Sequence, residues 1–301
     1  MNVRIDSSSG FCWGVVRSVN IAEGTLKNNN NEKKTYVLGS IIHNPKETER
    51  LAEKGLETIT HEDFERISKA GPADVIIRAH GEPPSTYEKA DQFGIHIIDA
   101  TCPLVTGLQN RVKRFYDKGY NIIIYGKINH PEVIGIRGMI NDDCLIVKSV
   151  EEVLEKVDFT KRLALFSQTT MEKPTYIKIR DLIASKVESF VEGGDSKEHF
   201  QSKNTLCNQV WGREDKVVDF ALQNDLIIFV AGRNSSNGIS LFKHMLKKNP
   251  NMYYIEDVDE LKREWFEGAK NVGITGATST PNWYLEKVKF QIEDMFEFEL
   301  A

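Results

Sequence analysis

Short apolar runs alternate with longer amphipathic stretches along most of the 301-residue chain. Runs rich in β-branched residues predict strands at 2–5, 35–39, 74–79, 95–100, 121–126, 144–148, 162–167, 226–232, 252–256 and 271–276. Between them, periodic stretches such as 15–26, 105–117, 175–190, 214–223 and 283–296 predict helices. This alternation indicates an α/β fold with largely parallel sheets. Several runs are apolar on both faces, as sheets covered by helices require.

The same order of parts occurs three times, and each copy begins with a cysteine just before a helical stretch. Cys12, Cys102 and Cys207 are each followed by a helix, an apolar strand and a polar loop. Further along each copy, another strand ends in a second polar loop. Such periodicity predicts three α/β units related by a pseudo-threefold axis. The units are 1–98, 99–193 and 194–301, and the last of them includes a C-terminal helix.

The position of the three cysteines predicts one shared metal site. In parallel α/β units, ligands gather at the carboxyl ends of the strands, where each unit places one thiol and two polar loops. A helix N-terminus also favours the thiolate form of a cysteine. Cys144 starts the run 144–148 and has no counterpart in the other copies, so it is interpreted as a buried structural residue.

The residues alone leave the identity of the metal open. Structural zinc sites usually close with four ligands and a short C-x₂₋₄-C pair, which this sequence lacks. Iron–sulfur clusters take thiolates from distant segments, usually four of them. Three thiolates leave one position open, which favours catalysis over a structural role.

The loops after the strands supply groups suited to a phosphate. Imidazoles, hydroxyls and amides close to helix N-termini can bind anions. These candidates are His43, His80, His130, Ser235, Ser236, Asn237 and the hydroxyl-rich loop residues Thr278, Ser279 and Thr280. Glu132 lies beside His130 at a strand end and is the candidate proton donor. Neither a P-loop nor a G-x-G-x-x-G sequence occurs, so nucleotide binding is not indicated.

Composition and sequence pattern argue against two classes of partner, nucleic acids and membranes. The net charge is −5, and no basic patch is interleaved with aromatic residues, so nucleic acid is not expected. No apolar run approaches the ~20 residues that span a bilayer, so no membrane partner is expected. The N-terminus shows no signal-peptide pattern. A cytoplasmic location, where thiols stay reduced, is therefore expected.

With these residues in view, the sequence resembles the 4-hydroxy-3-methylbut-2-enyl diphosphate reductase family over nearly its whole length. The resemblance rests on GFCWGV, IIHNP, RAHGEP, DATCPLV, NHPEVIG, SQTT, NSSNG and GATSTP, in the order and spacing of the family. Two segments depart from the usual pattern. After Cys207 the chain reads Asn-Gln in place of Ala-Thr but keeps Arg213, and TGLQN follows DATCPLV in place of Lys-Val-His.

The resemblance implies three α/β units around one four-iron–four-sulfur cluster, held by Cys12, Cys102 and Cys207. It also implies an allylic diphosphate substrate, whose hydroxyl is removed as water with two electrons and two protons to give isopentenyl and dimethylallyl diphosphate. The electron donor would be a protein of the ferredoxin or flavodoxin type.

The resemblance further implies roles for the loop residues. Thr169 and Thr170 would order the alcohol and the proton path from Glu132, with His130 nearby. The diphosphate would bind His43, His80, Ser235, Ser236, Asn237 and Ser279. Two alternatives remain open at this point. One is an iron–sulfur hydro-lyase or quinolinate-synthase-like enzyme, and the other is a non-catalytic iron–sulfur sensor.

Overall fold

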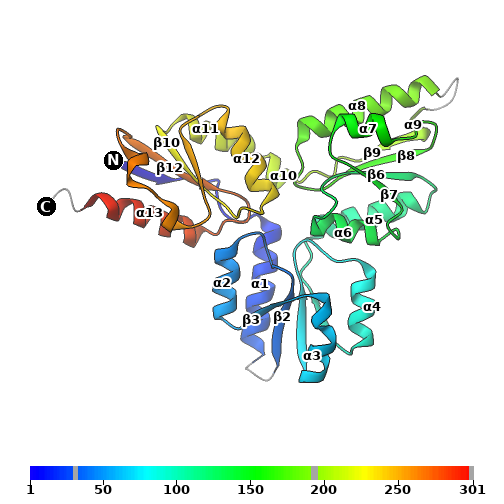
Figure 1. Cartoon of the computed structure of the whole chain (residues 1–301), viewed down its shortest axis with the longest axis horizontal. Helices are drawn as coiled ribbons and strands as arrows, with labels where there is room; N and C mark the ends of the chain where they lie inside the picture. Colours follow the sequence, from blue (N-terminus) through cyan, green and yellow to red (C-terminus); the bar gives the residue numbers. More distant parts are fainter. Residues whose placement is uncertain (30–32, 191–195, 298–301) are drawn as a thin grey trace. The chain divides into compact units, whose positions relative to one another are not determined.

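The computed structural model describes residues 1–29, 33–190 and 196–297, whose strands form three four-stranded parallel sheets (Figure 1). The β2–β4 sheet has the order β3 (Leu56–Ile59), β2 (Lys34–Leu38), β4 (Ala73–Ile77), β5 (His96–Asp99). The β6–β8 sheet has the order β7 (Cys144–Val147), β6 (Asn121–Tyr125), β8 (Leu163–Ser167), β9 (Phe200–Ser202). The β10–β12 sheet has the order β11 (Met252–Ile255), β10 (Leu226–Val230), β12 (Asn271–Gly276), β1 (Asn2–Ile5).

The three sheets repeat one topology, and the predicted α/β fold with largely parallel sheets is confirmed. In each sheet the strand that leads to a proposed ligand cysteine lies at one edge: β5 before Cys102, β9 before Cys207 and β1 before Cys12. The apolar pattern finds every strand except β3 and β9. Their sequences, LETI and FQS, are short and largely polar, so they lack the hydrophobic signal of the central strands.

Helices connect the strands. They are α1 (Trp13–Asn28), α2 (Pro45–Glu53), α3 (Phe64–Ala70), α4 (Pro84–Gln92), α5 (Pro103–Tyr116), α6 (Pro131–Gly138), α7 (Val150–Lys156), α8 (Lys173–Phe190), α9 (Ser196–His199), α10 (Asn208–Trp211), α11 (Glu214–Leu222), α12 (Ser236–Leu246) and α13 (Asn282–Glu297). Short 3₁₀ segments span His61–Asp63, Val258–Glu260 and Arg263–Phe266. None of the helices in the described residues is long and apolar enough to cross a membrane.

Proline fixes where three of these helices begin. The sequences HNP, TCP and NHP place proline in the first turn of α2, α5 and α6, where its φ suits the helix and no N–H is needed. The residue before a proline is driven to an extended backbone. Asn44, Cys102 and His130 accordingly have ψ of 110°, 128° and 136° and form the N-caps. Cys102 and His130 are predicted site residues, and Asn44 directly follows another, His43, so each helix starts within two residues of one.

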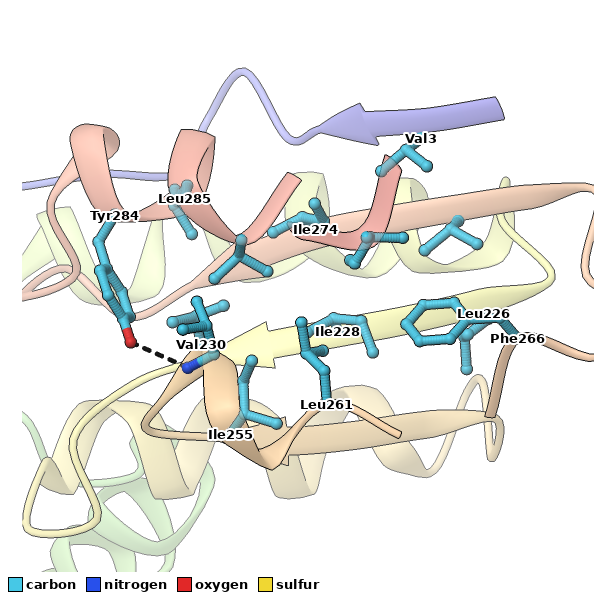
Figure 2. Close-up of a cluster of buried hydrophobic side chains, with 14 residues drawn as sticks. Val3, Leu226, Ile228, Val230, Ile255, Leu261, Phe266, Ile274, Tyr284 and Leu285 are labelled. Carbon is cyan, nitrogen blue, oxygen red and sulfur yellow. Dashed lines mark hydrogen bonds between the residues drawn. The ribbon is translucent and has the colours of Figure 1, made fainter. Parts of the chain in front are cut away.

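The β10–β12 sheet is covered on both faces, as its apolar sequence predicts. Leu226, Ile228 and Val230 point into a cluster formed with α13, shown in Figure 2. Ile227 and Phe229 point to the other face, into a cluster formed with α11 and α12. Alternate residues of one strand thus supply two cores, which anchors the loops at its carboxyl end.

Tyr284 lies at one end of the first cluster in Figure 2 and carries the only hydroxyl among the residues drawn there. That hydroxyl accepts a hydrogen bond from the Val258 amide at 3.0 Å and donates one to the Asp257 carboxylate at 3.1 Å. A buried tyrosine hydroxyl is costly unless paired, so both bonds allow the ring to pack in the core.

The chain divides into two compact units. The terminal unit comprises 1–26, 40–56 and 208–301, and the middle unit comprises 27–39 and 57–207. β1 pairs with β12 from Asn2↔Asn271 to Ile5↔Ile274, so the N-terminal strand completes the β10–β12 sheet. The three predicted units, 1–98, 99–193 and 194–301, stay a prediction.

Candidate active site

Each predicted ligand cysteine is held by its backbone in the same way. The amide of Cys12 donates to the Thr278 carbonyl at 3.0 Å, that of Cys102 to the Ala79 carbonyl at 3.0 Å, and that of Cys207 to the Thr169 carbonyl at 2.9 Å. The three acceptors follow equivalent strands, β12, β4 and β8, in the repeated sheet topology. The repeat seen in the sequence therefore extends to the hydrogen bonds that position the thiols.

The cysteines fit the role of thiolate ligands. All three are cysteines of intermediate exposure that directly precede α1, α5 and α10. A helix start favours negative charge on a thiol. Cys144 differs, because it begins β7 and burial raises the pKa of its thiol to about 11. That thiol stays protonated at neutral pH and packs beside the core of the β6–β8 sheet.

Glu132 and Thr169 form a buried pair in the middle unit. The Thr169 amide donates to Glu132 Oε1 at 2.6 Å, and the Thr169 hydroxyl donates to Oε2 at 2.7 Å. Glu132 is only 2% exposed, and burial raises the pKa of its carboxyl to about 7 although both bonds act to lower it. The group can therefore hold or release a proton near neutral pH.

His130 caps the helix on which Glu132 lies. The Glu132 amide donates to His130 Nδ1 at 3.2 Å, so the neutral imidazole carries its proton on Nε2. The His80 ring meets the His130 ring edge-on, with centroids 5.4 Å apart. His130 can thus present an N–H donor to an anion, and His80 lies beside it.

The predicted residues of the middle unit form a continuous series of contacts. Cys102 is connected to Cys207 by backbone hydrogen bonds, a contact between two histidine rings, a helix cap and the Glu132–Thr169 pair. The order is Cys102, Ala79, His80, His130, Glu132, Thr169 and Cys207. Thr170 follows Thr169, and its hydroxyl accepts a hydrogen bond from Gln168 Nε2 at 2.9 Å.

In the terminal unit, the N-terminus of α12 presents polar groups without any acidic residue in its first turn. Ser235 is the N-cap, and its hydroxyl oxygen accepts from the Gly238 amide at 3.1 Å. Ser236 and Asn237 follow in the first turn and are buried. Such a terminus is suited to an anion, because the helix dipole and the N–H groups of the first turn point to the same place.

Thr278 connects this helix start to a cysteine. Its hydroxyl oxygen accepts from Asn237 Nδ2 at 2.7 Å, and its carbonyl accepts from the Cys12 amide. The next residue, Ser279, donates through its hydroxyl to the His43 carbonyl at 3.5 Å. The predicted residues Cys12, His43, Asn237 and Ser279 are therefore brought together through one loop.

Gly232 lets two of these loops approach each other closely. A Cβ atom at this position would lie 2.5 Å from the His43 carbonyl oxygen, which is a backbone atom that cannot easily move. The Gly232 carbonyl in turn accepts from the Tyr254 hydroxyl at 2.7 Å. This glycine thus holds the His43 loop against the loop that leads to Ser235.

We expect Gly232→Ala to weaken substrate binding, because the new methyl group would push the two loops apart. The Michaelis constant should rise several-fold with a smaller change in turnover number. Gly24→Ala is the matched control, since no atom lies within 4 Å of its Cβ position, and alanine should stabilise that helix by up to ~1 kcal/mol. Unchanged steady-state kinetics for Gly232→Ala would show that the close approach has no functional role.

A pocket of about 340 Å³ opens beside His43 in the terminal unit. Its lining also includes Asn234, Gly232 and two carboxylates, Glu49 and Glu256. Negative charge in the wall disfavours a diphosphate, so the start of α12 suits such an anion better than this pocket does.

Sequence reasoning missed the residues that act through their backbone. Ala79 and the carbonyl of Thr169 were not expected to hold cysteines, and Thr278 was seen only as part of a hydroxyl-rich loop. Each acceptor directly precedes a predicted substrate residue: His80, Thr170 or Ser279. That shared position is the signal that could have found them.

Three like parallel sheets, a cysteine after one edge strand of each, and a buried acid in the middle unit define an α/β enzyme. Residues 3–293 match the family model described as LytB protein. The chain belongs to this family, which confirms the resemblance seen in its motifs.

The sequences of known relatives match this chain over almost their full length. The 4-hydroxy-3-methylbut-2-enyl diphosphate reductase of Chloroherpeton thalassium is 40% identical, and the match covers 99% of this chain and 98% of that protein. The reductase of the same name from Chlorobium phaeovibrioides is 42% identical, with 97% and 99% covered. The enzyme class predicted from the sequence is thereby confirmed.

Solved structures show the same likeness. A structure of (E)-4-hydroxy-3-methyl-but-2-enyl diphosphate reductase, described as the terminal enzyme of the non-mevalonate pathway, matches with a TM-score of 0.70 at 34% identity. That match covers 97% of this chain and 99% of the other. The E-1-hydroxy-2-methyl-but-2-enyl-4-diphosphate reductase from Plasmodium falciparum matches with a TM-score of 0.80 at 27% identity, covering 95% and 86%.

Proposed function

We propose that this chain catalyses the reductive dehydroxylation of (E)-4-hydroxy-3-methylbut-2-enyl diphosphate, the last step of the methylerythritol phosphate route to isoprenoids. The substrate takes up two electrons and two protons and yields water with isopentenyl or dimethylallyl diphosphate. One observation carries the proposal. Thr169 binds the carboxylate of Glu132 through its amide and hydroxyl and the amide of Cys207 through its carbonyl. A proton source and a proposed metal ligand are thus joined by one residue.

The cofactor that we propose is one four-iron–four-sulfur cluster with Cys12, Cys102 and Cys207 as its ligands. The family is iron–sulfur dependent. Three partly exposed cysteines at helix starts suit thiolate ligation. When bound, such a cluster supplies electrons and an open iron that acts as a Lewis acid toward the hydroxyl group.

Glu132 is the proposed proton donor to the departing hydroxyl. Its raised pKa keeps a proton available near neutral pH, and the Thr169 hydroxyl provides a path for it. Thr170 is held by Gln168 and would order the alcohol. Water is kept from this acid because Glu132 and Thr169 are both buried.

The diphosphate would bind donors from several loops. Asn237 has one amide hydrogen committed to Thr278, which leaves the second for a phosphate oxygen. The Ser235 hydroxyl accepts from Gly238 and can still donate its own hydrogen. The remaining proposed contacts are His43, His80, His130, Ser236 and Ser279.

Two further parts of the proposal concern partners and location. A ferredoxin-type or flavodoxin-type protein would supply the electrons, since the chain holds no second redox motif in its sequence. Four cysteines in a chain of this length do not make a disulfide framework, which suits the proposed cytoplasmic location.

Turnover of the allylic diphosphate with a chemical reductant under anaerobic conditions tests the proposed function. We expect both isoprenoid diphosphates to form, and their summed amount should equal the substrate consumed. One hydroxyl group is then removed as water in each turnover. A protein that binds iron but converts only dicarboxylates, or converts nothing and responds to a binding partner, would support the hydro-lyase or sensor alternatives instead.

We expect His43→Ala and Asn237→Ala to weaken diphosphate binding. Loss of one charge-assisted hydrogen bond costs about 1.5–3 kcal/mol. Both variants should keep their iron, and Asn251→Ala, which removes an exposed amide bonded to the Asp225 carbonyl, serves as control. Binding of inorganic diphosphate and the Michaelis constant measure the effect. Wild-type values in both variants would remove these loops from the substrate site.

A further inference from the structure

Arg213 is a cation held against the segments that position Cys12. It occupies the N-cap position of α11 without a side-chain hydrogen bond to that helix. Its guanidinium donates to the Gly10 carbonyl at 3.4 Å and to the Gly276 carbonyl at 3.3 Å. Gly10 lies two residues before Cys12. Gly276 lies two residues before Thr278, whose carbonyl accepts from the Cys12 amide. The same two loops therefore fix both the cation and the thiol.

The charge of Arg213 is poorly compensated. Its Nε is buried and has no hydrogen-bond partner, and no ion pair within the described residues includes this side chain. Burial lowers the pKa of the guanidinium, while the charges of Asp6 and Cys12 act in the opposite direction. Asp6 is itself occupied, because it accepts from the Ser8 amide and hydroxyl and from the Thr275 hydroxyl.

A largely desolvated guanidinium that has only neutral carbonyls as partners and an unpaired, buried Nε is costly, so a nearby anion is expected to balance its charge. Cys12 is the group in the right place, because its charge acts on the Arg213 guanidinium and it is a proposed metal ligand. Arginine also suits the site better than lysine, since its planar fork reaches two carbonyls at once while its charge stays fixed.

We propose that Arg213 is a positioning residue that sets the reduction potential of the metal centre through Cys12. This inference rests on the proposed iron–sulfur function. Reduction adds one electron, supplied by the external donor, to a centre that is already anionic through its thiolates. A fixed positive charge beside one ligand stabilises the reduced form, and it acts strongly because the surroundings are poorly solvated.

Three variants test this by separating charge from hydrogen bonding. Arg213→Gln removes the charge, and Arg213→Lys keeps it but loses the fork. Arg4→Gln is the matched control, because Arg4 is a partly buried arginine of the same unit that donates to Asn224 and to the Gln223 carbonyl. Each protein is reconstituted anaerobically, its iron and sulfide are counted, and its midpoint potential is measured by redox titration followed by absorbance and electron paramagnetic resonance.

We expect Arg213→Gln to keep its iron and to show a reduced-to-oxidised ratio about tenfold lower at fixed potential, which is 59 mV for one electron. Arg213→Lys should lie between wild type and Arg213→Gln, and Arg4→Gln should match wild type. A wild-type potential in iron-loaded Arg213→Gln would overturn the inference and leave the proposed function standing. Absence of a cluster in the wild-type protein would overturn both.

If Arg213→Gln loses its iron, its midpoint potential cannot be measured, and Asp6→Asn becomes the deciding variant. This change removes the negative charge that acts on the same guanidinium. Asparagine keeps one oxygen as acceptor for the Ser8 amide, and its amide nitrogen can donate to the Thr275 hydroxyl oxygen. If fixed charge at this place acts on the centre, its potential should rise. An unchanged potential in Asp6→Asn would then overturn the inference.

Discussion

Cys12→Ser, Cys102→Ser and Cys207→Ser should each lose most of their iron and all measurable turnover. A thiolate binds iron–sulfur clusters, and a serine hydroxyl stays protonated at neutral pH and is a poor substitute. With three proposed ligands, no spare thiol is available at the equivalent positions. Iron and sulfide per chain, visible absorbance after anaerobic reconstitution, and turnover with a chemical reductant measure the loss.

Cys144→Ser is the matched control. This thiol is partly buried beside the core of the β6–β8 sheet and belongs to none of the repeated positions. Its replacement should retain the cluster and activity and lower the free energy of unfolding by about 1 kcal/mol. The ligand assignment would be wrong if Cys144→Ser lost its iron while one of the other three variants kept it.

The repeat was visible in the sequence because side-chain chemistry recurs at matching places. Apolar strands, cysteines before helices and polar loops after strands all leave local signals. Proline after Asn44, Cys102 and His130 also fixes the helix starts directly. These features suffice to predict the fold class and to select most of the residues that the loops bring together.

Pairings over long sequence distances left no such signal. β1 pairs with β12, whose residues lie about 270 positions further along the chain. Nothing in the local sequence of either strand indicates which strand it pairs with. The predicted unit 1–98 follows chain order, whereas the sheets combine the first strand with the last ones. Polar strands such as β3 and β9 were missed because their pairing is stabilised by the sheet and not by their own composition.

Backbone interactions were equally hidden. The carbonyls of Ala79, Thr169 and Thr278 hold the cysteines, but any residue has a carbonyl, so residue type does not reveal them. The properties of Glu132 also depend on tertiary structure. Its position in the first turn of α6 is readable from the sequence, but its burial and its bonds to Thr169 are not.

Glu132→Gln should fold, keep its cluster and bind the diphosphate, but turn over at least ~100-fold more slowly. Glutamine can keep Oε1 as acceptor for the Thr169 amide, and its amide nitrogen can donate to the Thr169 hydroxyl oxygen. It cannot deliver a proton to the departing hydroxyl. General acid–base help is typically worth about 10²–10⁴-fold, and hydroxide is a poor leaving group without it.

The pH dependence gives a second measurement on the same variant. Because burial raises the pKa of Glu132 to about 7, its acid form is lost as the pH rises through that value. Wild-type turnover should therefore fall about tenfold per pH unit well above 7, and Glu132→Gln should lack this limb. Stability follows the same sign. The stabilising contribution of the raised pKa is complete below about 4.5 and is lost as the pH rises through about 7, whereas glutamine stays neutral throughout.

If Glu132 has only a structural role at the start of α6, a different result is expected. An acid in the first turn of a helix contributes at most ~1 kcal/mol through the dipole, and glutamine would replace it with little loss of activity. Thr169→Val separates the two further, because it removes the hydroxyl path while the amide and carbonyl of residue 169 remain. A proton donor acting through Thr169 predicts slow turnover and an intact cluster in both variants. Near-normal turnover in Glu132→Gln would return this carboxylate to the role of a helix-start acid, and the proton would then have to come from another group within hydrogen-bond reach of the substrate.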